Sequence, residues 1–133
     1  KIMANPNIVA VTNILGGNLG WNLTATATTT LMTVAAEKIV KVNRITVANV
    51  DTSSAANVFL YVDGLTTAGA DGITPTGASA TVYLAKEIAV PADSTLVLVD
   101  TPIYLMEGDI LKGGASAASD LDLFISYEVL DDA

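Results

Sequence analysis

Acidic side chains that stand close together are the residues of this sequence best suited to chemistry. Glu107 and Asp109 flank Gly108, and Asp63 and Asp71 bracket a glycine-containing stretch. Two carboxyl groups that face one sugar ring can hydrolyse a glycoside when their surroundings push their pKa values apart. Nothing in the spacing of either pair indicates such convergence, and Asp and Gly favour turns for backbone reasons alone. We therefore interpret both pairs as turn residues.

Other catalytic and metal-binding groups are missing from the sequence. The chain has no cysteine and no histidine, which removes the usual nucleophile, the usual general base and the commonest transition-metal ligand. Asp-rich loops could supply oxygen ligands to calcium, but the spacing of a calcium-binding loop is absent. The stretch GGNLG at 16–20 has no lysine and lacks the spacing of a phosphate-binding loop. We predict no catalytic residue, no metal site and no cofactor, and hence no enzyme.

Composition narrows the choice of partners. The 133 residues include 14 acidic and 6 basic side chains, for a net charge of −8, so a nucleic acid would be repelled. No window approaches the run of about 18 apolar residues that a membrane-spanning helix needs, and no targeting segment is evident at the N-terminus. However, 51% of the residues are hydrophobic and only 15% are charged. This surplus indicates apolar surface that neighbouring subunits cover.

The aromatic residues could form a stacking platform for sugars, which would make the chain a carbohydrate-binding module. They lie on different predicted strands, and only 5% of the residues are aromatic. Packing in the core or between subunits is the interpretation we prefer for this group, which comprises Trp21, Tyr61, Tyr83, Tyr104 and Tyr127.

Alternation of apolar and polar residues predicts β-strands over most of the chain. The stretch WNLTATATTTLMTVAA at 21–36 alternates cleanly and predicts a half-exposed strand. In KIVKVNRITVANV the apolar parity flips across Asn43 and Arg44, which predicts a bulge, a bend or a crossing between sheets. The glycine-rich stretch after Asp63 predicts a long surface loop. Altogether the pattern predicts an all-β fold, a single β-sandwich or jelly-roll-like domain of about eight mostly antiparallel strands.

The two ends of the chain carry the candidate contact residues. Residues 1–15 predict an extended N-terminal arm or a first strand that stops at Gly16 and Gly17, ahead of a β-sandwich domain at 16–133. The last strand alternates, with two apolar residues on its otherwise polar face. We predict that contacts with neighbouring subunits are made by Asn5, Pro6, Asn7, Ile8, Val9, Val11, Ile14, Leu15, Phe124 and Leu130.

Three stretches of the sequence carry a resemblance to a known family. They are ANPNIVAVTNILG, KVNRITVANVDTSSAANVFLYV and PADSTLVLVDTPIYLMEGDILKGGASAASDLDLFISYEVL. In this order they resemble small virion structural proteins of tailed bacteriophages, especially those of marine bacteria and cyanobacteria. The likeness spans most of the chain apart from the glycine-rich loop, and it rests on packing and turn motifs.

The resemblance implies a capsid decoration or cement protein. Such a protein would be made in the cytoplasm of the bacterial host, associate with itself as a trimer or dimer, and bind the major capsid protein on the outside of the head. The N-terminal segment would reach a neighbour by strand addition. A neck, tail or fibre component of the virion is the alternative, and a carbohydrate-binding β-sandwich for host recognition is the alternative outside the structural class.

Overall fold

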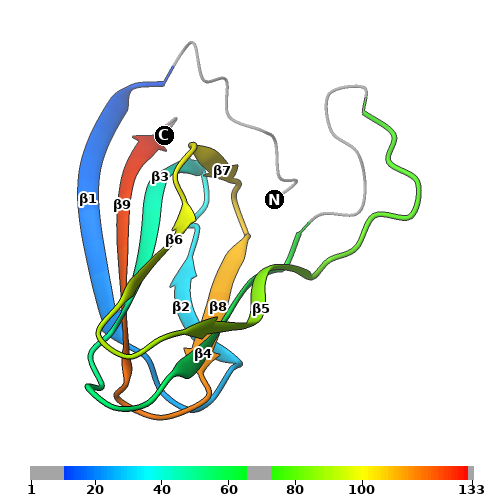
Figure 1. The fold of residues 1–133 in the computed structure, drawn as a ribbon. Coiled ribbons are helices and arrows are strands. Elements are labelled where there is room, and N and C mark those ends of the chain that lie inside the picture. Colours follow the sequence, from blue (N-terminus) through cyan, green and yellow to red (C-terminus); the bar gives the residue numbers. More distant parts are fainter. Residues whose placement is uncertain (1–10, 66–72, 132–133) are drawn as a thin grey trace.

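The computed structural model describes residues 11–65 and 73–131, and these residues form an all-β protein of two antiparallel sheets. The sheets face one another as the two layers of a β-sandwich (Figure 1). The nine strands within the described residues are β1 (Asn13–Asn22), β2 (Thr29–Thr33), β3 (Lys38–Asn49), β4 (Ala56–Asp63), β5 (Val82–Val90), β6 (Thr95–Val99), β7 (Ile103–Leu105), β8 (Ile110–Ala115) and β9 (Leu121–Asp131).

Strand order places the first and the last strand side by side in one sheet. Sheet A has the order β1-β9-β3-β6, with β7 paired to another part of β3, and sheet B has the order β2-β8-β4-β5. One apolar face of each sheet packs into a shared core, as alternation requires when one face is buried. The largest fully buried side chains of this core come from both sheets and from Leu23, which directly follows β1. Those in the sheets are Ile45, Leu60, Leu111, Leu121, Leu123, Ile125, Val42, Val47, Val58 and Val90.

The parity flip in the third strand is a β-bulge, as the sequence predicted. The register between β3 and β9 shifts between Val42 and Arg44. Val42 lies before the bulge and Ile45 after it, and both are fully buried. The extra residue at Asn43 thus lets a strand whose alternation changes phase keep its apolar side chains on the core side.

Two strand boundaries differ from the sequence prediction. The first strand does not stop at Gly16 and Gly17, because β1 continues to Asn22. The alternating residues 23–28 are not a strand but the connection between β1 and β2. Leu23 is buried there, and the Thr24 hydroxyl lies 3.0 Å from the Thr29 hydroxyl. Backbone bonds to neighbouring strands persist only at its start, where the Leu23 N–H donates to the Leu121 carbonyl oxygen and the Thr24 carbonyl oxygen accepts the Ala115 N–H, both at 2.8 Å. Local hydrogen bonds of threonine hold the turn that follows.

The long loop predicted after Asp63 joins β4 to β5. Its described part is exposed throughout 73–81, and the exposure continues to Leu84 at the start of β5. This segment extends away from the two sheets (Figure 1). The Leu65 N–H donates to the Ala80 carbonyl oxygen at 3.0 Å, so the two ends of the loop are held together at its base.

Candidate functional site

The acidic residues next to Gly108 hold a turn together. A Glu107 carboxylate oxygen accepts the Glu37 N–H at 2.6 Å, and an Asp109 oxygen accepts the Met106 N–H at 2.8 Å. Both carboxyl groups are buried, and burial raises the pKa of Asp109. The backbone bonds account for both residues without a substrate, in agreement with our interpretation of them as turn residues.

Asp63 connects three segments at one end of sheet B. Its carboxylate accepts hydrogen bonds from Lys112 at 2.9 Å, from the Thr81 hydroxyl at 2.7 Å and from the Gly64 N–H at 2.9 Å. The bond from Lys112, followed by the other two, lowers the pKa of Asp63 to about 2. Its proposed companion Asp71 lies outside the described residues. The role of Asp63 is to join β4 to β8 and to the start of β5.

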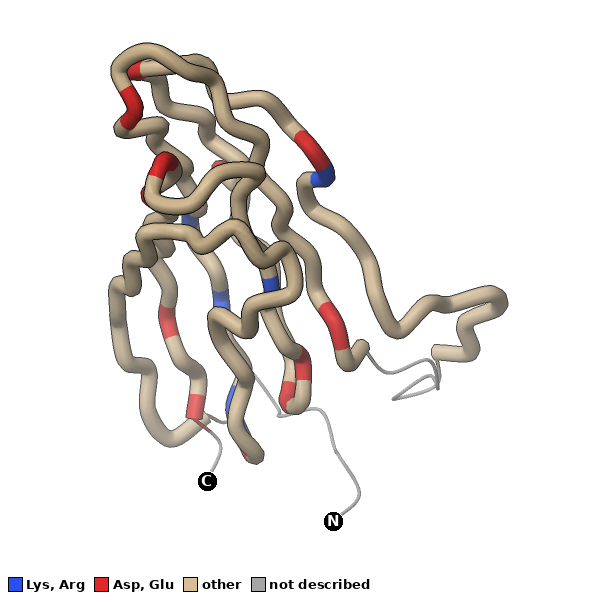
Figure 2. Tube along the Cα trace, turned by 90° about the horizontal axis from the view of Figure 1, so that it is seen from below, with Lys and Arg blue, Asp and Glu red and all other residues tan. Residues whose placement is uncertain are grey.

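Within 11–65 and 73–131, no group of three or more acidic, histidine or cysteine residues is placed to hold a metal ion. The same residues include no helix long and apolar enough to cross a membrane. Acidic positions outnumber basic ones along the trace (Figure 2).

The outer face of sheet A carries an apolar row that crosses four strands. Strand register places Gly20 of β1 beside Phe124 of β9, Phe124 beside Thr46 of β3, and Thr46 beside Val97 of β6. Phe124 is 46% exposed and Val97 is 40% exposed. Large side chains thus alternate with small ones across a sheet surface. We call these four residues the Phe124 row.

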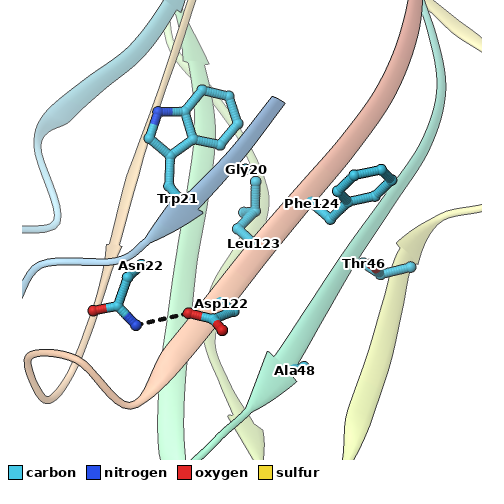
Figure 3. Close-up of a pocket in the computed structure, with 8 residues that line it drawn as sticks. All are labelled: Gly20, Trp21, Asn22, Thr46, Ala48, Asp122, Leu123 and Phe124. Atoms are coloured by element: carbon cyan, nitrogen blue, oxygen red, sulfur yellow. Dashed lines mark hydrogen bonds between the residues drawn. The ribbon is translucent and has the colours of Figure 1, made fainter. Parts of the chain in front are cut away.

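A shallow depression of about 370 Å³ adjoins this row on β1, β9 and β3. Figure 3 shows that it contains one polar contact, where the Asn22 side chain donates to Asp122 at 2.7 Å. Its remaining lining is mostly apolar or small, and the eight lining residues are Gly20, Trp21, Asn22, Thr46, Ala48, Asp122, Leu123 and Phe124. This lining suits contact with an apolar side chain of a partner more than chemistry on a substrate.

Phe124 and Leu130, the two apolar residues predicted on the polar face of β9, have different surroundings. Phe124 is exposed, as described above, whereas Leu130 is only 8% exposed. Leu130 is paired with Ile39 of β3 on one side and with Ile14 of β1 on the other, and Ile39 is buried. Phe124 is therefore the one of the two that the fold leaves accessible.

The predicted N-terminal contact residues divide into two groups. Asn5, Pro6, Asn7, Ile8 and Val9 lie outside the described residues. Val11 is half-buried, whereas Ile14 is 60% exposed and Leu15 is 57% exposed, both at the start of β1. Phe124 pairs with Gly20 of the same strand, so β9 and β1 bring the two predicted contact regions into one sheet.

Some exposed apolar residues were not among the predicted contacts. Beyond Ile14, Leu15 and Phe124, the exposed large hydrophobic residues are Leu19, Val50, Ile73, Val82, Tyr83, Leu84, Ile88, Val97 and Tyr104. Four of these lie on β5, an edge strand that pairs irregularly with β4 and has a positive φ at Glu87. Sequence alternation gives no signal for these β5 residues, because the register shifts within the strand.

The aromatic residues do not form one platform. Tyr61 is buried, and its ring centroid lies 5.0 Å from that of Tyr83 on sheet B. Tyr104 and Phe124 share the outer face of sheet A. Tyr104 lies opposite Lys41 of β3, and Lys41 lies opposite Glu128 of β9, so Tyr104 is level with Glu128 and not with Phe124. Four residues along a strand correspond to about 13 Å, so these two rings are too far apart to hold a single sugar ring.

Comparison of the chain with protein-family models, with curated proteins and with solved structures found no match. The candidate site is thus defined by the surface itself. It consists of the Phe124 row with its adjoining depression and of the exposed start of β1, both on sheet A.

Proposed function

We propose that this protein is a structural component of a tailed-bacteriophage virion, a capsid decoration protein that binds the outside of the head and stabilises contacts between major capsid subunits. It acts by binding and catalyses no reaction. In this proposal it is made in the cytoplasm of the bacterial host and works on the outer capsid surface. The observation that carries the proposal is the apolar surface of a small, acidic β-sandwich, together with the resemblance of its sequence segments to virion proteins.

The outer face of sheet A is suited to bind a rigid shell. It is a preformed sheet surface, so little conformational entropy is lost when a partner covers it. Phe124 supplies an exposed aromatic anchor, and the small residues Gly20 and Ala48 leave space next to it. Aromatic residues surrounded by smaller ones often carry most of the binding energy of an interface.

Stabilisation of the shell follows from linkage between binding and assembly. A protein that binds only the assembled capsid favours assembly by about 2.7 kcal/mol per site when its free concentration is 100 times the dissociation constant. Many copies add these contributions over the whole particle. The shell then resists the pressure of packaged DNA better than it would alone.

The test compares particles that contain the protein with particles that lack it. We expect a density map of the intact particle to place this β-sandwich on the outer capsid surface, at a copy number comparable with that of the major capsid protein. We also expect particles without it to release their DNA at a lower temperature, and added protein to restore the release temperature. A copy number limited to one ring would instead identify a neck or tail component, and absence from the particle would refute both virion roles.

A further inference from the structure

Within residues 11–65 and 73–131, strand β1 forms an edge of sheet A without the usual protection against pairing. It pairs with β9 without any register shift from Asn13 opposite Asp131 to Asn22 opposite Asp122. Among the described residues no strand pairs with its other side. Natural edge strands are usually shortened, bulged or marked by charges or proline. The ten residues of β1 contain no charge, no proline and no bulge.

The backbone hydrogen bonds between β1 and β9 involve every second residue of β1, and this identifies the backbone groups of β1 that are free to bond to another strand. The Leu23 N–H donates to the Leu121 carbonyl oxygen at 2.8 Å, one step beyond the last pair of β1 and β9. Bonded pairs recur at every second residue of an antiparallel ladder, so the odd-numbered residues of β1 bond to β9. The even-numbered ones therefore direct their N–H and C=O groups to the unpaired edge: Ile14, Gly16, Asn18, Gly20 and Asn22.

The odd-numbered residues place apolar side chains at the same edge of the core. Leu15 and Leu19 lie opposite Val129 and Ile125, which puts them on the core side of sheet A. Nevertheless Leu15 is 57% exposed and Leu19 is 38% exposed. The core is thus incompletely covered along β1, and a further strand beside it would bury these side chains.

The distribution of charge indicates which partner could approach this edge. No charged residue occurs between Lys1 and Glu37, a range that includes β1 and also β2, an edge strand of sheet B. Two copies of a chain with a net charge of −8 repel one another. This repulsion is weakest where the surfaces that meet carry no acidic side chains. A basic partner would instead be drawn to the acidic parts of the surface. The uncharged edge therefore favours a second copy of this chain.

We propose that two copies pair antiparallel through β1, about a two-fold axis at Asn18, so that their A sheets form one continuous sheet. Ile14 then lies opposite the partner's Asn22, Gly16 opposite the partner's Gly20, and Asn18 opposite the partner's Asn18. This register engages every available residue of the edge, whereas a shift in either direction leaves one unmatched. Asn18 faces Asn18 of the second copy at the centre of the paired strands, where the two-fold axis passes.

The pairing register centred on Asn18 also covers the apolar side chains that β1 leaves exposed at the edge of the core. Leu15 lies opposite the partner's Trp21. Leu19 lies opposite the partner's Gly17, where the ring of Tyr127 occupies the space that a side chain would take, so Leu19 would pack against that ring. Burial of both leucines in each copy adds hydrophobic stabilisation to the backbone hydrogen bonds. Pairing about Asn18 is thus self-complementary in backbone hydrogen bonds and in charge.

The first test measures self-association of the isolated full chain by analytical ultracentrifugation, which makes the result independent of any role in a virion. We expect a monomer–dimer equilibrium. The substitution Asn18→Lys places two lysines opposite one another, and we expect it to weaken dimerisation at least about tenfold. Thr52→Lys adds the same charge in an exposed loop between β3 and β4 and should leave the equilibrium unchanged.

A cross-linking test locates the axis even if Asn18→Lys perturbs the fold. Directly opposite residues of a bonded antiparallel pair have Cα atoms about 5.5 Å apart, which suits a disulfide. Because the chain has no cysteine, Asn18→Cys introduces a single thiol, and we expect rapid oxidation to a covalent dimer. Thr52→Cys is the control for random collision. A monomeric or trimeric wild-type chain, or a dimer that Asn18→Lys leaves intact and Asn18→Cys fails to cross-link, would overturn the proposal.

Discussion

Asn49 of β3 donates a hydrogen bond from its side-chain amide to the Val90 carbonyl oxygen of β5 at 2.8 Å, and so joins sheet A to sheet B. The same amide donates to the Ser54 carbonyl oxygen at 2.9 Å, and the side-chain oxygen accepts the Asp51 N–H at 2.9 Å. One buried side chain thus organises the end of both sheets and the loop between β3 and β4.

Loss of the Asn49 amide should destabilise the protein clearly. Asn49→Ala leaves the Val90 carbonyl oxygen buried without this donor, and we expect the free energy of unfolding to fall by about 1–3 kcal/mol. Urea denaturation followed by Trp21 fluorescence measures the change. The control Asn13→Ala removes an exposed amide at the start of β1 and should change stability by no more than about 0.5 kcal/mol. Equal effects of the two substitutions would contradict the role assigned to Asn49.

Gly113 of β8 permits close approach to β4. A Cβ atom at this position would overlap the Phe59 carbonyl oxygen and lie 3.2 Å from a methyl carbon of Leu60. We expect Gly113→Ala to lower the free energy of unfolding by about 1–3 kcal/mol, because a backbone atom must move. Gly16→Ala is the matched strand control, since nothing lies within 4 Å of its added Cβ. A neutral Gly113→Ala would show that β8 and β4 can separate without cost.

The Asp63 carboxylate should support stability at neutral pH and lose this effect in acid. Its folded-state pKa is about 2, below the ordinary value of 3.8, so the unfolded chain binds the proton more readily. The contribution is therefore complete above about 3.8 and disappears as the pH falls toward about 2. We expect wild type to exceed Asp63→Asn in stability at neutral pH and the two to converge in acid. Urea denaturation across this pH range tests it, and a constant difference would contradict it.

The Asp109 carboxyl should have the opposite pH dependence. Burial raises its pKa above 3.8, so the folded chain binds the proton more readily than the unfolded chain. Stability conferred by this group therefore rises as the pH falls through the raised pKa toward 3.8. Asp109→Asn keeps an oxygen that can accept the Met106 N–H but cannot titrate. We expect wild type to gain stability relative to this variant on acidification, and a parallel pH profile would refute the assignment.

Sequence periodicity predicted much of the fold because one face of most strands is buried. Alternation identified the last strand, and the parity change at Asn43 identified the bulge in β3. Alternation of Thr and Ala at 23–28 was misleading, since polar–apolar alternation also occurs in a connection whose threonines bond locally. Sequence periodicity shows which side chains alternate between polar and apolar, but it does not show which backbone groups form hydrogen bonds with another strand.

The candidate site was predictable only in part. Phe124 stood out as an apolar residue on a polar face, and the structure leaves it exposed. Leu130 had the same signal but is buried beside Ile39, a neighbour that only the pairing of β9 with β3 supplies. Leu19 and Val97 were missed, although the uncharged run before Glu37 could have indicated Leu19. Exposure depends on the neighbours that strand pairing brings together, which no local pattern encodes.

Phe124 should matter for binding to the capsid and little for folding, if the outer face of sheet A is the binding surface. Phe124→Ser removes an exposed ring from the Phe124 row, so we expect stability to change by less than about 1 kcal/mol. Loss of a central aromatic anchor should weaken co-sedimentation with particles that lack the protein by at least about tenfold. Val50→Ser is the matched control, because Val50 is a similarly exposed apolar residue in the loop after β3. If both variants co-sediment like wild type, the capsid contact lies on another face, and the exposed residues of β5 become the next surface to substitute.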